Sequence, residues 1–189
     1  MKSLRYVAAL LVASYDLITL QAAVFNLGHT LSEMARDERE LREALKLVEL
    51  DREICVSLGL GRDSAQAEIV AGMICLELGE LDEAQQWLSA GQLIVETLDS
   101  DYNRGGVEEL RARLLWTRAW RDHQKLEPQA IREIMEAYRT ARDFIFVAGF
   151  DVSYLDAEIK LVKQGQPPPW RRPRWSRADL DDTASVLPG

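Results

Sequence analysis

Apolar residues recur along most of the chain at intervals of three and four positions, which is the spacing of an amphipathic α-helix. Prolines are absent before Pro128, and no run in the first 164 positions alternates apolar and polar residues as a strand would. Clusters of Gly, Asp, Asn or Pro predict helix boundaries at 14–16, 36–37, 58–63, 79–80, 99–106, 127–128 and 149–151. The pattern therefore predicts an all-α body of about eight helices.

The clearest pair of helices spans Ala65–Leu98, with a break at Gly79. Small residues stand at Gly72, Ala84 and Gly91, where a neighbouring helix could approach closely. This spacing, with LGELDEA between the two helices, resembles a tetratricopeptide repeat (TPR). The sequence departs from the family where Glu68 replaces a bulky residue and where a cysteine replaces a tyrosine.

Fainter copies of this repeat flank it, at residues 24–48 and 107–138, and Glu68 aligns with Glu109 at a spacing of 41 residues. The resemblance covers residues 16–163. It implies a right-handed α-hairpin solenoid of about three hairpins plus flanking helices. These repeats resemble the variety found in the sensor regions of bacterial signalling ATPases and transcription activators.

The stretch that begins at Asp99 has Asp and Asn at alternate positions, as a calcium-binding loop does. Arg104 stands where such a loop needs glycine, and Leu110 stands where it needs glutamate. We therefore interpret residues 99–106 as a connector between two repeats, whose acidic side chains cap helices.

The composition is that of one well-buried domain: 189 residues, 47% apolar and 29% charged. The net charge of −8 argues against nucleic-acid binding by the helical body, because contacts along a phosphate backbone need a basic face. Cys55 and Cys75 lie in apolar helical pattern, which favours buried thiols and a reducing, cytoplasmic setting. We interpret the N-terminal residues 1–14 as a helix, not a signal peptide, and no segment is long enough to span a bilayer.

The sequence predicts no catalytic residue, no metal site and no cofactor. His29 and His123 lack a helical neighbour that would complete a metal pair. Neither cysteine has a recognisable base nearby. The chain is therefore expected to be non-enzymatic.

The TPR resemblance implies that the first helix of each hairpin lines a concave face. The residues expected there are Phe25, His29, Ile69, Met73, Leu76, Leu110 and Leu114. An apolar channel at this place would bind a partner helix or extended peptide, with methionine adapting to its shape. The alternative is that these side chains only pack against neighbouring helices, and the sequence leaves both open.

Residues 165–189 form a second predicted unit, a Pro/Arg/Trp-rich extended tail after the helical domain of residues 1–164. Its interaction residues are predicted to be Trp170, Arg171, Arg172, Arg174, Trp175 and Arg177. Without the tail's four basic and three acidic residues, the body keeps 19 basic and 28 acidic residues, a net charge of −9. The tail could contact single-stranded nucleic acid, serve as a motif for a partner protein, or lie back on the acidic body as a strap. The last two readings are favoured, because four arginines are few for nucleic acid.

The sequence thus predicts a protein-interaction scaffold or adaptor, with a role in signalling or transcriptional regulation implied by the resemblance. The alternative is a nucleic-acid-associated factor that acts through the tail. The identity of the partner and the formation of a homo-oligomer stay open.

Overall fold

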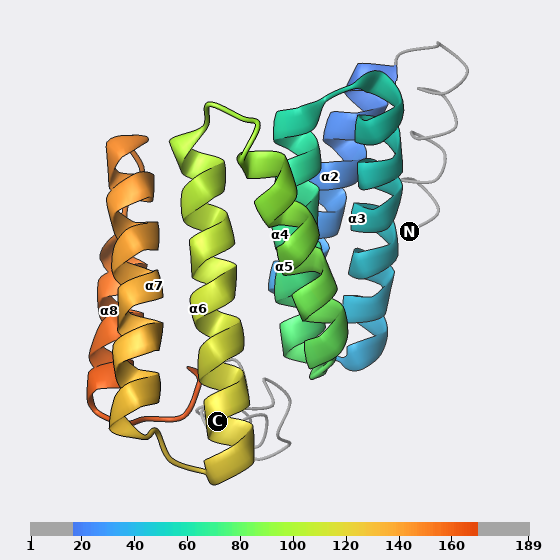
Figure 1. Ribbon diagram of the computed structural model, residues 1–189. Helices are drawn as coiled ribbons and strands as arrows, with labels where there is room; N and C mark the ends of the chain where they lie inside the picture. Colours follow the sequence, from blue (N-terminus) through green and yellow to red (C-terminus); the bar gives the residue numbers. More distant parts are fainter. Residues whose placement is uncertain (1–16, 170–189) are drawn as a thin grey trace, which may run out of the picture.

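The structure, a computed structural model, describes residues 17–169 (Figure 1). In this range the regular secondary structure is α-helical and contains no strand, which confirms the all-α prediction. The predicted helix at residues 1–14 and the predicted tail residues 170–177 lie outside the described range. The helices are α2 (Leu17–Met34), α3 (Glu38–Leu58), α4 (Gly61–Leu78), α5 (Leu81–Val95), α6 (Asp101–His123), α7 (Pro128–Val147) and α8 (Ser153–Lys163).

Most helix boundaries lie where turn residues predict them. Asp37 caps α3, because its Oδ1 accepts a hydrogen bond from the backbone N–H of Glu40 at 2.8 Å. Gly59 and Gly79 end α3 and α4 with φ angles of 69° and 80°, a left-handed conformation that glycine adopts without steric cost. Pro128 begins α7, where its missing N–H is not needed.

The predicted connector at residues 99–106 is wrong in its extent, because α6 already begins at Asp101. Gly105 and Gly106 are helical, and neither makes a turn. A β-carbon on Gly105 would lie 2.4 Å from Ile145 Cγ1, and one on Gly106 would lie 2.9 Å from Ile69 Cδ1. These glycines let α7 and α4 approach α6 closely, so they mark helix packing.

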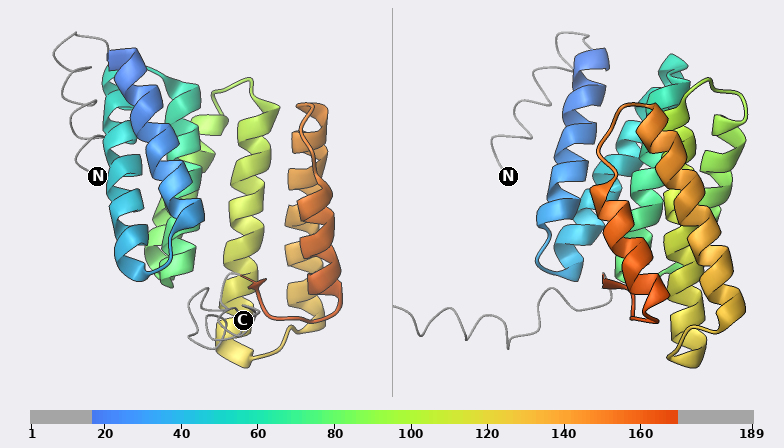
Figure 2. Two further views of the ribbon diagram at one scale, coloured as in Figure 1. Left: turned by 180° about the vertical axis from the view of Figure 1, so that it is seen from behind. Right: turned by 90° about the vertical axis from the view of Figure 1, so that its left-hand side faces the viewer.

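The helices follow one another as antiparallel hairpins, α2–α3, α4–α5 and α6–α7, and α8 packs against α7. In Figure 1, α3, α5 and α7 lie toward the viewer, whereas the reverse view in Figure 2 brings α2 and α8 to the front. Helix α4 also contacts α6 and, more weakly, α2. Gly28, Gly72 and Gly91 lie at helix contacts, where an added β-carbon would come within 3.0, 2.4 and 3.3 Å of a side chain on the neighbouring helix.

Three apolar clusters form the core, one for each group of neighbouring helices. The cluster of α6, α7 and α8 contains Trp116 and Tyr138, whose rings meet edge to face with centroids 6.2 Å apart. The cluster of α4, α5 and α6 contains Leu88 and Leu114. None of the helices between residues 17 and 169 combines the length and apolar character that a membrane span requires.

The chain does not leave the body where α8 ends. It turns at Gly165, which has a φ angle of 63°, and crosses from α8 to α6. The Trp116 Nε1–H donates a hydrogen bond to the Gln166 carbonyl at 3.1 Å, and Pro168 is buried. The described part of the predicted tail, residues 165–169, therefore packs on the helical body.

Candidate interaction face

The predicted groove residues divide into an accessible group and a buried group. Phe25 and His29 on α2, and Ile69 and Met73 on α4, are half-buried. We call the face formed by α2, α4, α6 and α8 the even-helix face, and define it by six residues. These are Phe25, His29, Ile69, Met73, Arg113 and Tyr154.

The other three predicted groove residues lie beneath this face. Leu76, Leu110 and Leu114 are 3, 0 and 1% exposed and belong to the core cluster of α4, α5 and α6. Leu110 occupies the space that the missing side chain of Gly72 leaves, since a β-carbon there would lie 2.4 Å from Leu110 Cδ2. These leucines hold α4 against α6 and are inaccessible to a partner in this structure.

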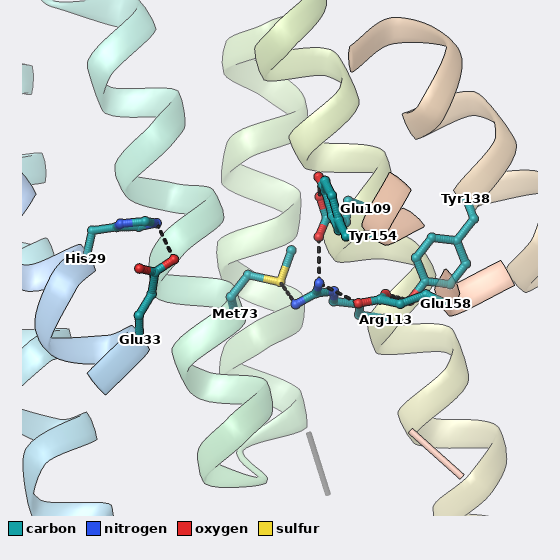
Figure 3. A network of polar contacts seen from close by, with 8 residues as sticks. All are labelled: His29, Glu33, Met73, Glu109, Arg113, Tyr138, Tyr154 and Glu158. Carbon is teal, nitrogen blue, oxygen red and sulfur yellow. Dashed lines mark hydrogen bonds and ion pairs between the residues drawn. The ribbon is translucent and has the colours of Figure 1, made fainter. Parts of the chain in front are cut away.

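On α2 the accessible residues form a stacked pair. The rings of Phe25 and His29 are 6.0 Å apart between centroids with an interplanar angle of 19°. His29 Nε2 also lies 3.8 Å from Glu33 Oε1, one turn further along the helix. In Figure 3 this His29–Glu33 pair lies on the opposite side of Met73 from Arg113. Helix α2 therefore supplies an aromatic edge with a carboxylate beside it.

On α4 the accessible residues lead directly to α6. Ile69 lies over Gly106 of α6, and the missing side chain of Gly106 leaves room for it. One turn further along α4, Met73 Sδ accepts a hydrogen bond from Arg113 Nη1 at 3.6 Å. The apolar surface of α4 therefore ends at the guanidinium of Arg113.

A network of ion pairs and hydrogen bonds joins α6, α7 and α8 at this point (Figure 3). Arg113 Nη2 lies 2.8 Å from Glu109 Oε1 and 2.7 Å from Glu158 Oε1. The second oxygen of each carboxylate accepts from a tyrosine: Tyr154 donates to Glu109 at 2.8 Å, and Tyr138 donates to Glu158. The side chains of Arg113, Glu109 and Glu158 are only 21, 10 and 13% exposed.

Burial and the network together shift the pKa values of these groups. Burial raises the pKa of the Glu158 carboxyl, although Arg113 and the Tyr138 hydroxyl act in the opposite direction. Burial alone would lower the pKa of Arg113, but Glu109 and Glu158 outweigh it and raise that pKa. Burial is the main cause that raises the pKa of Tyr138, and the charge of Glu158 raises it further. The network is thus one cation held between two acids, with a net charge of −1 when all three are ionised.

The guanidinium of Arg113 is held in place, and neither cysteine is an activated nucleophile. Arg113 is held by several partners at once, and such a group is pre-organised. Burial raises the pKa of both cysteine thiols, Cys55 and Cys75, to about 12, which keeps them protonated and poorly nucleophilic. Among residues 17–169, no group of three or more His, Cys, Asp or Glu side chains is placed to hold a metal ion.

A hollow of about 560 Å³ lies between α5, α6 and α7, away from the even-helix face. Its apolar wall includes Leu93, Val107 and Phe144, and its polar rim includes Glu96 and Arg104. None of the predicted groove residues lines it. It is an open surface groove without a buried charged group, so we regard the even-helix face as the better candidate.

Sequence reasoning missed the residues of the ion-pair network. Glu109 and Arg113 have the spacing of an ion pair on one helix, which was a readable signal. Glu158 lies 45 residues after Arg113, and nothing in the sequence links the two. The predicted tail residues, Trp170 to Arg177, lie outside the described range and cannot be placed against this face. No protein-family model, curated protein or solved structure matches this chain.

Proposed function

We propose that the chain is a non-enzymatic scaffold that binds a helix or extended segment of another protein on the even-helix face. The observation that carries this proposal is the set of half-buried side chains Phe25, Ile69 and Met73, from two helices, beside the fixed charge of Arg113. A partner could bury apolar groups on the first three while the network fixes its register.

We also propose that the helices form a right-handed α-hairpin solenoid of the TPR type. The succession of hairpins and the contact of α4 with both α5 and α6 support this arrangement. So do the TPR-like small residues Gly72, Ala84 and Gly91, which all lie at buried positions. In such an array the first helix of each hairpin contributes to a common binding face. The role in signalling or transcriptional regulation stays a prediction from the resemblance.

The chemistry of the face indicates the kind of segment that it would take. Met73 offers a flexible, polarizable surface to an apolar or aromatic anchor. The network is net negative, and Glu33 adds a carboxylate at the α2 edge, so basic residues beside that anchor would be favoured. We therefore expect an apolar segment with basic flanks.

The test compares the full chain with two single variants in a nuclease-treated pull-down, followed by mass spectrometry. Met73→Glu places a charge in the middle of the face. Val56→Glu is the matched control, because Val56 is 61% exposed on α3, a helix outside this face. We expect a partner that the wild type and Val56→Glu retain and Met73→Glu loses, with unchanged circular dichroism.

Two outcomes would contradict the proposal. One is a partner that Met73→Glu retains as well as the wild type does. The other is a partner lost only when residues 170–189 are removed, which would favour the tail as the working part of the chain. Binding through its arginines to nucleic acid would weaken steeply between low and physiological salt, whereas apolar binding would change little.

A further inference from the structure

The described chain ends beside the even-helix face. Trp116, whose side chain binds the Gln166 carbonyl, is three residues after Arg113 on α6, so the returning segment lies about one helical turn from the network. Pro168 is buried, which fixes the path of the chain almost to its last described residue. The described part of the chain therefore ends at Pro169, close to α6 and the network.

We propose that residues 170–177 of the same chain bind back across the even-helix face. Trp170 and Trp175 would contact the apolar surface near Ile69 and Met73, and the four arginines would face the acidic side chains of the network. This inference rests on the proposed function, because it assigns the first occupant of the same surface.

The segment is long enough for this path. Helices pack about 8–10 Å apart, so the distance from α6 across α4 to α2 is roughly 20 Å. Eight extended residues span at most about 26 Å. Only a few residues separate the segment from the anchored residue Gln166, and such a short linker gives a local concentration of the segment at the face in the millimolar range.

Charge and surface chemistry both match. The segment carries four arginines and no acid before Asp179, whereas residues 1–164 carry 19 basic and 28 acidic residues. At the face, Arg113 is paired with two acids, Glu109 and Glu158, so its network is net negative when all three groups are ionised. Tryptophan and arginine can also cover apolar side chains with their flat or extended parts, and methionine sulfur is favourable beside an aromatic ring. The segment thus has the chemistry that we expect of a partner.

A bound segment would regulate the face by competition. If the segment occupies the face nine-tenths of the time, the apparent affinity for an outside partner falls about tenfold. A partner would then have to displace the segment, and any change that holds the segment elsewhere would open the face.

The test uses the full chain without a partner. A nitroxide label attached through Ser176→Cys reports on nearby amide protons by NMR line broadening. Cys55 and Cys75 are 0 and 1% exposed, so the introduced thiol can be labelled selectively. We expect broadening at Ile69, Met73 and Arg113.

Two tail variants separate binding from mere tethering. Replacing the four arginines by lysines keeps the charge, and the broadening should persist. Replacing them by glutamates reverses the charge with the same tether length, and the broadening should be lost. Val56 on α3 and Leu93 on α5 should stay sharp throughout.

The proposal is overturned if the glutamate variant broadens the same signals equally, or if the affected signals lie on α3 and α5. It is also overturned if a mixture of labelled chains and isotope-enriched unlabelled chains shows the broadening, because the segment would then bind a second copy. None of these failures affects the Met73→Glu comparison, so the proposed function is tested separately.

Discussion

Replacing Arg113 by methionine is the sharpest perturbation of the even-helix face. The change preserves much of the side chain's length but removes the positive charge that pairs with both Glu109 and Glu158. Both carboxylates are largely buried, at 10 and 13% exposed, and both would lose the cation that they share. Removing one partner of a buried ion pair costs about 3–5 kcal/mol. Since Arg113 is 21% exposed, we expect the lower end, about 3 kcal/mol, at pH 7.5.

The loss of unfolding free energy in Arg113→Met should depend on pH, and the burial of Glu158 determines the direction of this dependence. Burial already raises the pKa of Glu158 in the wild type, and without Arg113 the pKa of this carboxyl in the folded state would rise further. A group whose pKa is higher in the folded than in the unfolded state contributes stability at low pH and loses it as the pH rises. The deficit of Arg113→Met should therefore be smallest near pH 5 and largest above pH 7.

The assay is urea denaturation at several pH values, with Arg118→Met as the control. Arg118 lies on the same helix, but its partners are the neutral oxygens of Gln85 at 2.8 Å and Leu81 at 3.4 Å. The control should lose about 1 kcal/mol, independent of pH. A deficit for Arg113→Met below about 1 kcal/mol, or one equally large at pH 5 and pH 7.5, would refute the reasoning.

Three further predictions concern the core. Burial raises the pKa of Asp51 from 3.8 to about 6, so this group contributes stability below pH 4 that is lost as the pH rises through 6. Asp51→Asn should remove this pH dependence of the free energy of unfolding. In chemical denaturation the variant should become more stable than the wild type, by up to about 3 kcal/mol, as the pH rises from 4 to 7. Cys55 and Cys75 should resist a thiol reagent at pH 7.5 until the chain is unfolded, and rapid native labelling would contradict their burial. Gly72→Ala should cost about 1–2 kcal/mol in thermal unfolding, because overpacking outweighs the better helix propensity of alanine. The cost should shrink in a Leu110→Ala background, and an additive double variant would argue against the contact.

The helices were predictable because their ends depend on local chemistry. A glycine in the left-handed conformation at Gly59 or Gly79, and a carboxylate cap at Asp37, act within a few residues of the chain. The same reasoning failed at Gly105 and Gly106, because a glycine also serves where another helix comes close. Sequence alone does not separate these two uses, since the packing partner Ile145 lies 40 residues further on.

The candidate site was only partly predictable, for a related reason. The TPR resemblance implied a common face for Phe25, Ile69 and Met73, which are half-buried, but it could not tell them from Leu110, which fills the space at Gly72 and is fully buried. The alignment of Glu68 with Glu109 was also informative, since both side chains lie buried in the middle of a helix.

The equivalence of these two glutamates stops at their positions. Glu68 pairs with Arg52 of the preceding hairpin, whereas Glu109 pairs with Arg113 of its own helix and with Tyr154 of α8. The alignment thus indicated that both glutamates are buried, whereas the side chains that surround each one in space decide what it binds.

The network has a further consequence, because it determines how the last helix is seated. Helix α8 has 11 residues and buries an apolar stripe that includes Leu155, Ile159 and Val162, a contact that other rotations of a short helix could also satisfy in part. We expect the bonds from Glu158 and Tyr154 to α6 and α7 to favour one rotation of α8, because each bond requires its side chain to face a fixed partner. That rotation sets where the chain turns at Gly165 and returns to Trp116. Loss of Arg113 should therefore loosen the crossing segment as well as the face, so amide hydrogen exchange at residues 164–166 should quicken in Arg113→Met and stay unchanged in Arg118→Met.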